Sequence, residues 1–206
     1  CNQCHLDQSP NWAASQMQSI WPNFQSAAAD HWQRDDGADI YLAEGIASLY
    51  AGDPVQRAVA AEAIGLRVAQ GHQDARHWIP HLLAAMTDNY PAVRRFAARS
   101  LEQSLVHLPP ANRELVDLQS QLGVAETSGS DAQLLAAIQR FDFIADQYLR
   151  NQQLAQVLQL WTIRSAGWQA SSRTDLLLTP NYLPDEQVDD LQALGYQRSG
   201  EISIGE

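Results

Sequence analysis

An all-α fold is predicted for this chain of 206 residues by three observations. Apolar residues recur over most of the sequence at the three- and four-residue spacings of amphipathic helices. Proline stands where several of these patterns begin, a position that its fixed φ suits. Two pairs of predicted helices also resemble each other, as expected when one helical unit is repeated. We expect three regions: residues 1–36, residues 37–124 with the helical repeats, and residues 125–206 with a helical segment and an extended tail.

The first predicted helix follows Ser9. A serine hydroxyl caps helix N-termini well, and Pro10 suits the first turn. The helical pattern continues to Trp21, where Pro22 ends it. Residues 22–37 are expected to be irregular because they close on a polar, glycine-containing turn. Four further helices are expected after this turn, over residues 40–50, 54–68, 75–87 and 91–105.

Two of these helices align with an offset of 37 residues, the difference between Pro54 and Pro91. The alignment superposes Arg57 on Arg94, Ala60 and Ala61 on Ala97 and Ala98, and Ile64 on Leu101. The series Asp88, Pro91, Val93, Arg94, Ala97 and Leu101 resembles the second helix of a HEAT repeat. In that interpretation small alanines permit close helix packing, and the arginine reaches an acidic group in the preceding turn or in the next repeat. An unrelated helix bundle with similar capping is the alternative.

The C-terminal part is expected to be helical with interruptions. A short helix is expected over residues 112–122 and an exposed linker over 125–130. The longest helical pattern covers residues 131–166, with Asn151 as the expected break between two helices. Beyond Gly167 we expect a mixed tail. It would contain a short helix from Pro184 to Leu194 and one strand at residues 202–204.

The first five residues, Cys1-Asn2-Gln3-Cys4-His5, spell C-x-x-C-H, the attachment signature of a c-type haem. At this spacing two thiols reach the two vinyl groups of the porphyrin, and the adjacent imidazole binds the iron. Cys1 and Cys4 would form the thioethers, and His5 would be the proximal ligand. The chain has only 2 cysteines, so neither is left for a structural disulfide.

Two other interpretations of this motif remain open. A redox-active C-x-x-C dithiol usually lies where a strand meets a helix, and no strand is predicted near the motif. A zinc site would combine Cys1, Cys4 and His5 with a distant histidine. Adjacent Cys4 and His5 diverge too sharply to share one tetrahedral metal comfortably.

The surroundings of the haem are less closely defined by the sequence. Trp12 and Trp21 are candidate walls of a haem pocket, although ordinary core aromatic residues fit the same pattern. A histidine or a methionine would supply the sixth iron ligand. We favour His31, which lies in an irregular, tryptophan-flanked stretch and can fold back, with Met17 second. A ligand from outside this chain is the third possibility.

Other candidate sites are weaker. His77 and His81 have the i, i+4 spacing of a metal-binding pair, but Pro80 lies between them and no third ligand is near, so we expect both to be solvated. The acidic pairs at residues 35–36 and 189–190 are also expected to face solvent. No catalytic residue is predicted, because the sequence has no G-x-S-x-G, no H-E-x-x-H and no glycine-rich phosphate loop.

Charge argues against nucleic acid as a partner, and hydropathy argues against a membrane span. The formal net charge is −11, from 24 acidic and 13 basic residues, whereas nucleic-acid binding requires a basic surface. All of the basic residues are arginines, so lysine chemistry is excluded. No apolar run is long enough to span a membrane. An acidic protein is expected to bind a partner with a basic docking surface.

The chain resembles the C-terminal portion of multihaem c-type cytochromes that combine haem-binding segments with HEAT-like or tetratricopeptide-like repeats. The residues that carry this resemblance are Cys1 to His5, Trp12-Ala13-Ala14 and the segment from Asp88 to Arg94. It implies at least one covalent haem c, a periplasmic or extracellular location, and electron transport. The chain would be an electron carrier rather than an enzyme.

Only one haem motif is present, so the resemblance implies that further haems belong to a longer chain or to redox partner proteins. We therefore expect this chain to be part of a larger protein or complex. Two other functions stay open: a repeat-based docking or assembly subunit of a redox complex, and a component of a multihaem reductase with an open iron position.

Overall fold

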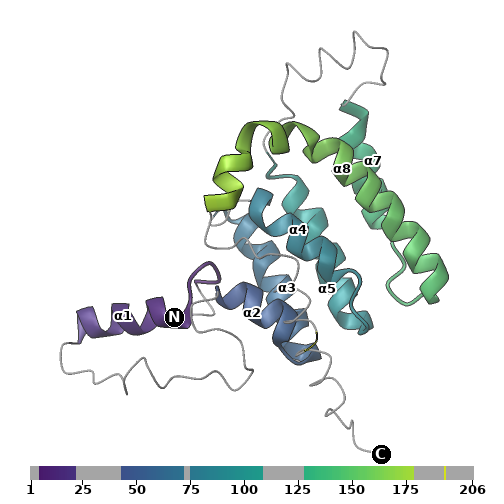
Figure 1. Ribbon diagram of the computed structural model, residues 1–206. Coiled ribbons are helices and arrows are strands. Elements are labelled where there is room, and N and C mark those ends of the chain that lie inside the picture. The colour runs from purple at the N-terminus through teal and green to yellow at the C-terminus, as the bar shows by residue number, and fades with distance from the viewer. Residues whose placement is uncertain (1–4, 22–42, 72–74, 109–127, 179–192, 194–206) are drawn as a thin grey trace, which may run out of the picture.

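The computed structural model describes residues 5–21, 43–71, 75–108, 128–178 and 193. These residues form helices and no strand, which confirms the predicted all-α class. Three successive helix pairs make up most of the structure, and α1 projects away from them at one side (Figure 1). The helices are α1 (Pro10–Ile20), α2 (Glu44–Ala51), α3 (Pro54–Ala69), α4 (Ala75–Ala85), α5 (Pro91–Leu105), α7 (Ser128–Gln139) and α8 (Gln147–Leu178).

Helix α1 begins as the sequence predicts. Ser9 is its N-cap, and the Ser9 hydroxyl accepts a hydrogen bond from the backbone N–H of Trp12 at 3.2 Å. Pro10 occupies the first turn, where its missing N–H would have no helical partner in any case. The helix ends at Ile20, immediately before the predicted end at Trp21.

Helix α3 has the most complete cap. The Asp53 carboxylate accepts hydrogen bonds from the backbone N–H groups of Val55 and Gln56, and the Gln56 side chain accepts one from the Asp53 N–H. This capping box satisfies several N–H groups that the start of a helix leaves without partners. Helix α5 also begins at the predicted proline, Pro91, but no side chain caps it.

The three pairs are α2 with α3, α4 with α5, and α7 with α8. The first two pairs are joined by their second helices, since α3 packs along α5, and the third pair is joined to the second through α5 and α7. Gly65 of α3 lies directly against Ser100 of α5, so that a Cβ at residue 65 would come within 2.4 Å of the Ser100 hydroxyl. This contact brings the two helix backbones close together. The fully buried side chains of the core include Ile46, Ile64, Trp78, Leu82, Val93 and Leu101.

The third pair departs from the prediction. The break between its helices lies between Gln139 and Gln147, so the predicted break at Asn151 is wrong. The reason is a turn stabilised by aspartate: the Asp142 carboxylate accepts from the N–H of Ile144, two residues later. Such side-chain bonds compete with helical hydrogen bonds. Asp146 then caps α8 by accepting from the N–H of Leu149.

Two boundaries of this pair also differ. Helix α7 begins at Ser128, so the part of the predicted linker from residue 128 to 130 is helical. Helix α8 continues through Gly167 to Leu178, although we expected a mixed tail beyond Gly167. One glycine within a helix costs only about 1 kcal/mol relative to alanine, too little to end a long helix by itself. The predicted helices at 112–122 and 184–194 and the predicted strand lie outside the described residues, apart from residue 193.

Candidate functional site

The segment that follows the cysteine motif forms a tight turn. The backbone N–H of Gln8 donates to the His5 carbonyl oxygen at 3.0 Å. Within this turn the His5 side chain is exposed, whereas Leu6 retains only 4% of its accessible surface. The two neighbouring side chains therefore have opposite surroundings: Leu6 is part of the core, and the His5 imidazole is accessible.

This turn is docked on the start of helix α2. The Gly45 N–H donates to the Leu6 carbonyl at 2.8 Å, and the Glu44 N–H donates to the Gln8 carbonyl at 2.9 Å. These N–H groups belong to the first turn of a helix, where no helical acceptor exists for them. A Cβ at Gly45 would lie 2.8 Å from the Trp78 ring and 3.1 Å from Leu6. A glycine therefore allows both Trp78 and Leu6 to lie close to the backbone of residue 45.

The His5 ring contacts Trp12, the candidate pocket wall. The two ring centroids are 4.9 Å apart and the planes are tilted by 54°. No hydrogen bond joins the His5 imidazole to another residue that the structure describes, so the ring nitrogens are not engaged by them. An aromatic contact of this kind holds a ring in place without using its nitrogens.

The other predicted site residues are not gathered here. Trp21 lies at the opposite end of α1 and is 57% exposed. An 11-residue helix is about 16 Å long, so Trp21 does not share the surroundings of His5. Met17 is five positions beyond Trp12 on the same helix and is partly exposed. Cys1, Cys4 and His31 lie outside the described residues.

The donor set at the start of the chain fits a covalent haem chemically. Two thiols at C-x-x-C spacing supply the thioether bonds, and an accessible imidazole immediately follows them. Among the residues that the structure describes, no three His, Cys, Asp or Glu side chains gather as a separate metal site. If haem is bound, Cys1 and Cys4 would hold it and His5 would bind its iron.

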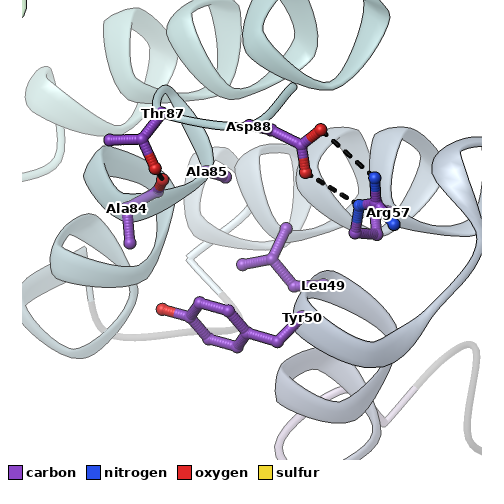
Figure 2. A pocket seen from close by; sticks show the side chains of 7 residues that line it. All are labelled: Leu49, Tyr50, Arg57, Ala84, Ala85, Thr87 and Asp88. Carbon is purple, nitrogen blue, oxygen red and sulfur yellow. Dashed lines mark hydrogen bonds and ion pairs between the residues drawn. The ribbon is translucent and has the colours of Figure 1, made fainter. Parts of the chain in front are cut away.

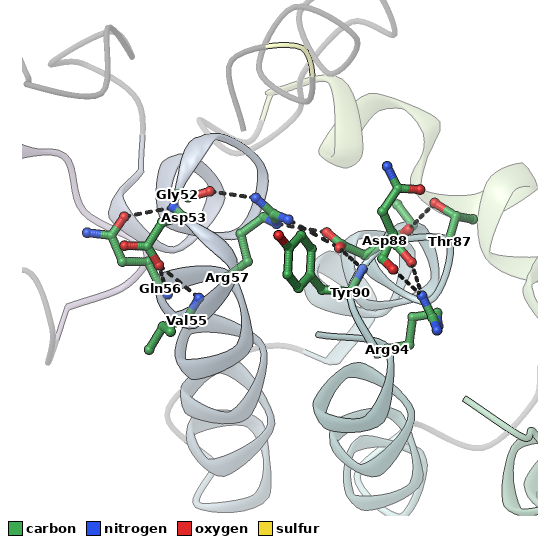
Figure 3. A network of polar contacts seen from close by, with 11 residues as sticks. Gly52, Asp53, Val55, Gln56, Arg57, Thr87, Asp88, Tyr90 and Arg94 are labelled. Atoms are coloured by element: carbon green, nitrogen blue, oxygen red, sulfur yellow. Dashed lines mark hydrogen bonds and ion pairs between the residues drawn. The ribbon is translucent and has the colours of Figure 1, made fainter. Parts of the chain in front are cut away.

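A second candidate site is a network of arginines between the helix pairs (Figure 3). The Arg57 guanidinium binds the Asp88 carboxylate, with Nε to Oδ2 at 2.8 Å and Nη2 to Oδ1 at 3.2 Å. Both residues are buried. The predicted contact between this arginine and an acidic group of the following unit is therefore confirmed for Arg57. The Arg57 guanidinium also lies over the Tyr90 ring, 5.8 Å from its centroid.

Arg94 makes a different contact. Its Nη1 donates to the Asp88 and Asn89 carbonyl oxygens, at 2.6 and 2.8 Å. Its Nε and Nη2 both donate to the Phe143 carbonyl in the α7–α8 connection, at 2.9 and 2.6 Å. The hydrogen bonds of Arg94 thus go to carbonyl oxygens instead of the predicted carboxylate. The nearby Asp142 carboxylate accepts from Ile144 in its own turn.

Comparison of the second helices identifies a third arginine of the same kind. Arg150 is the fourth residue of α8, as Arg57 and Arg94 are of α3 and α5. In each case Nη1 donates to the carbonyl oxygen five residues earlier: Arg57 to Gly52, Arg94 to Asn89, and Arg150 to Ala145. The sequence alignment missed Arg150 because it was anchored on two prolines that lie 37 residues apart. Helix α8 starts without a proline, and Arg150 lies 56 residues after Arg94.

The arginines carry charge into a poorly solvated region. Burial lowers the pKa of Arg94, and the neighbouring Arg150 lowers it further, whereas Asp88 acts in the opposite direction. The network therefore contains a repulsive pair of cations, Arg94 and Arg150, and the carbonyl oxygens of Phe143, Asp88 and Asn89 compensate for part of the desolvation of Arg94.

A small pocket with a cavity volume of about 10 Å³ lies beside this network (Figure 2). It is bounded by Leu49 and Tyr50 of α2, by Ala84 and Ala85 of α4, and by the Arg57–Asp88 pair with Thr87. Sites for drug-sized ligands usually have volumes of roughly 300 to 1,000 Å³. The charged groups of the pocket already bind each other, so this pocket is the weaker candidate for a ligand.

His81 is not the solvated residue that we expected. Its Nδ1 is 2.9 Å from the Tyr50 hydroxyl, and its ring also contacts Trp78, with centroids 6.0 Å apart. Burial raises the pKa of the Tyr50 phenol. Helix α4 accommodates Pro80 in its interior, and His77 on the same helix is partly buried. The role of His81 is therefore to satisfy a buried hydroxyl.

No protein family, curated protein or solved structure matches this chain.

Proposed function

We propose that this chain is an extracytoplasmic c-type cytochrome that transfers electrons as part of a multihaem protein or redox complex. The observation that carries the proposal is the motif Cys1-Asn2-Gln3-Cys4-His5, which contains the only 2 cysteines of the chain. Haem bound there would supply a one-electron couple between ferric and ferrous iron. Cys1 and Cys4 would hold it covalently, and a ring nitrogen of His5 would bind the iron.

The geometry around His5 supports this assignment. The imidazole is exposed, while its backbone is tied to α2 through the docked turn. A metal-binding histidine benefits from such an arrangement, because the ligand is accessible and its position is fixed before binding. His31 and, after it, Met17 are our proposed sixth ligands. Trp12 is the pocket wall that we retain, because Trp21 lies at the far end of α1.

We further propose that the helix pairs form a HEAT-like array that serves as a docking platform. Its support is the arginine at the fourth position of α3, α5 and α8, with the same bond to the carbonyl five residues earlier. The pairs also pack in order, with α3 on α5 and α5 on α7, and Arg94 of α5 binds the Phe143 carbonyl in the α7–α8 connection. An array of this type offers an extended surface for a partner.

The charge distribution bears on that partner. Arginines and acidic residues are equal in number over the residues that the structure describes, so the net charge of −11 belongs to the remaining segments. Attraction of a basic partner would therefore depend on acidic side chains outside the described helices. Binding of this kind weakens as salt is added.

The experiment that tests the cytochrome proposal is expression with covalent haem-attachment machinery, followed by denatured intact mass and a reduced-minus-oxidised spectrum. We expect the mass of one haem on the natural chain and a sharp c-type α band. Cys1→Ser combined with Cys4→Ser should lose both signals, whereas Ser15→Ala, an exposed control on α1, should keep them. A natural chain without added mass would overturn the proposal.

A second candidate function, a docking subunit without a redox role, is favoured by one surface feature. Val55, Val59 and Leu66 are 67, 60 and 46% exposed. Their spacing places them along one face of α3, opposite its core side. A haem-free natural chain that still folds and self-associates or binds a redox complex would support this alternative.

A further inference from the structure

His5 is held from two directions. On its C-terminal side, Leu6 is buried against Gly45 and Trp78, and the Leu6 carbonyl accepts the Gly45 N–H at 2.8 Å. This contact fixes where the His5 backbone lies relative to α2. It leaves rotation about the side-chain bonds of His5 free, so a second contact is required to orient the imidazole.

Trp12 provides that contact. Its backbone N–H is bound by the Ser9 hydroxyl at 3.2 Å, which places Trp12 in the first turn of α1. Its indole lies against the His5 ring with centroids 4.9 Å apart, and the indole is itself partly buried. The contact involves the ring faces, and the His5 side chain remains exposed. Trp21, at the other end of the same helix, makes no ring contact with a described residue.

We propose that Trp12 is a positioning residue that orients the His5 imidazole for binding the haem iron. The proposal rests on the proposed function and extends it to a residue outside the C-x-x-C-H motif. A ligand that is already oriented loses less conformational freedom when it binds. Removal of the indole should therefore weaken the bond between His5 and iron while the covalent attachment through Cys1 and Cys4 persists.

The first arm of the test needs no haem. In protein carrying Cys1→Ser and Cys4→Ser, with ¹³C-labelled histidine, the His5 ring protons should be shifted by the indole ring current. His5→Gln would identify these signals among the 6 histidines. We expect Trp12→Leu to abolish the shift, and Trp21→Leu, the matched control, to leave it unchanged. Equal far-UV circular dichroism would show that the variants remain folded.

The second arm uses the haem-loaded protein and follows the low-spin spectrum during acidification. Loss of one aromatic contact should weaken the axial bond about fivefold, which would raise the pH midpoint for loss of the low-spin state by about 0.7. Trp12→Phe should restore part of the difference because it retains a ring. Trp21→Leu should match the natural protein. The carboxylates of Asp7 in the docked turn and of Glu44 at the start of α2 are present in every variant, so they do not cause a difference between the midpoints.

The two arms separate the possible failures. If haem is attached and Trp12→Leu changes neither the ring-current shift nor the acid midpoint, this inference is overturned while the cytochrome proposal stands. If the natural chain carries no haem, the proposed function is wrong. The proposed role of Trp12 is then wrong as well, even when the first arm shows the contact between the two rings. If Trp21→Leu shifts the acid midpoint as much as Trp12→Leu does, the assignment of Trp12 as the positioning residue is also overturned.

Discussion

The Arg57 guanidinium and the Asp88 carboxylate form a buried two-point contact between residues 31 positions apart in the chain. Arg57 belongs to α3, and Asp88 belongs to the turn that precedes α5. The same carboxylate accepts the Tyr90 N–H at 2.8 Å, so one side chain both shapes the turn and joins two helix pairs. A contact with both functions should be important for the stability of the array.

Asp88→Ala should therefore be strongly destabilising. It would leave Arg57 as a buried cation without its carboxylate, which typically costs about 3 to 5 kcal/mol. Asp142→Ala is a matched control, because Asp142 forms the same type of turn but is exposed. We expect this variant to lower the free energy of unfolding by about 1 kcal/mol or less. Urea unfolding of both variants measures the difference. Equal losses would show that the ion pair adds nothing to the turn.

Gly65→Ala tests the close approach of α3 and α5. The added Cβ would lie 2.4 Å from Ser100 Oγ, 2.5 Å from its Cβ and 2.8 Å from its Cα, so the helices must move apart. Overpacking of this kind typically costs about 1 to 3 kcal/mol. The double variant Gly65→Ala, Ser100→Gly removes two of the three clashing atoms and should recover part of the loss. If the double variant is no more stable than Gly65→Ala, the loss of stability does not come from the contact with Ser100 of α5.

Much of the helical framework could be predicted from local sequence signals. Ser9 with Pro10, Asp53 with Pro54, and Pro91 each mark a helix start where the structure has one. These signals depend on one turn of chain and are visible without tertiary information. The predicted all-α class followed from them.

The third helix pair could not be predicted equally well. Its connection contains Phe141, Phe143 and Ile144, which continue a helical pattern, and it is broken by aspartate side chains that bind nearby N–H groups. Arg94 also contributes to this turn, because it binds the Phe143 carbonyl from another helix pair. A contact across 49 positions leaves no local signal.

The candidate site shows the same division. The motif Cys1 to His5 predicts haem attachment from residue type and spacing alone. The docking of Leu6 on Gly45 and Trp78 was not predicted, because it joins residues that are close only in the folded chain. Gly45 itself gave no signal, since a glycine within a helical pattern is also tolerated without any special contact.

Gly45→Ala should release the docked turn. The new Cβ would meet the Trp78 ring at 2.8 Å and Leu6 at 3.1 Å, so the Trp78 ring and the docked turn must shift apart. We expect faster hydrogen exchange at the N–H groups of residues 44 and 45, which donate to the turn, and unchanged exchange within α5. Leu6→Ala should produce the same local pattern through loss of burial. Uniformly faster exchange throughout α3 and α5 would instead indicate global destabilisation.

Tyr50 should make the fold sensitive to high pH. Burial raises the pKa of its phenol in the folded state, whereas an unfolded tyrosine ionises near pH 10. The unfolded chain therefore loses this proton first, and the stabilisation is fully present below about pH 10 and lost as the pH rises toward the folded pKa. The free energy of unfolding should fall by up to about 1.4 kcal/mol per pH unit in that range.

Urea unfolding at several values from pH 8 to pH 11.5 would measure this slope. Tyr50→Phe should remove the contribution of Tyr50 to it, at the cost of about 1 kcal/mol near neutral pH, because the hydrogen bond to His81 at 2.9 Å is lost. Tyr148→Phe is the control: that side chain is 74% exposed and is solvated in both states, so its replacement should preserve the slope. A slope that is identical in Tyr50→Phe and the natural protein would mean that other groups cause the alkaline loss of stability.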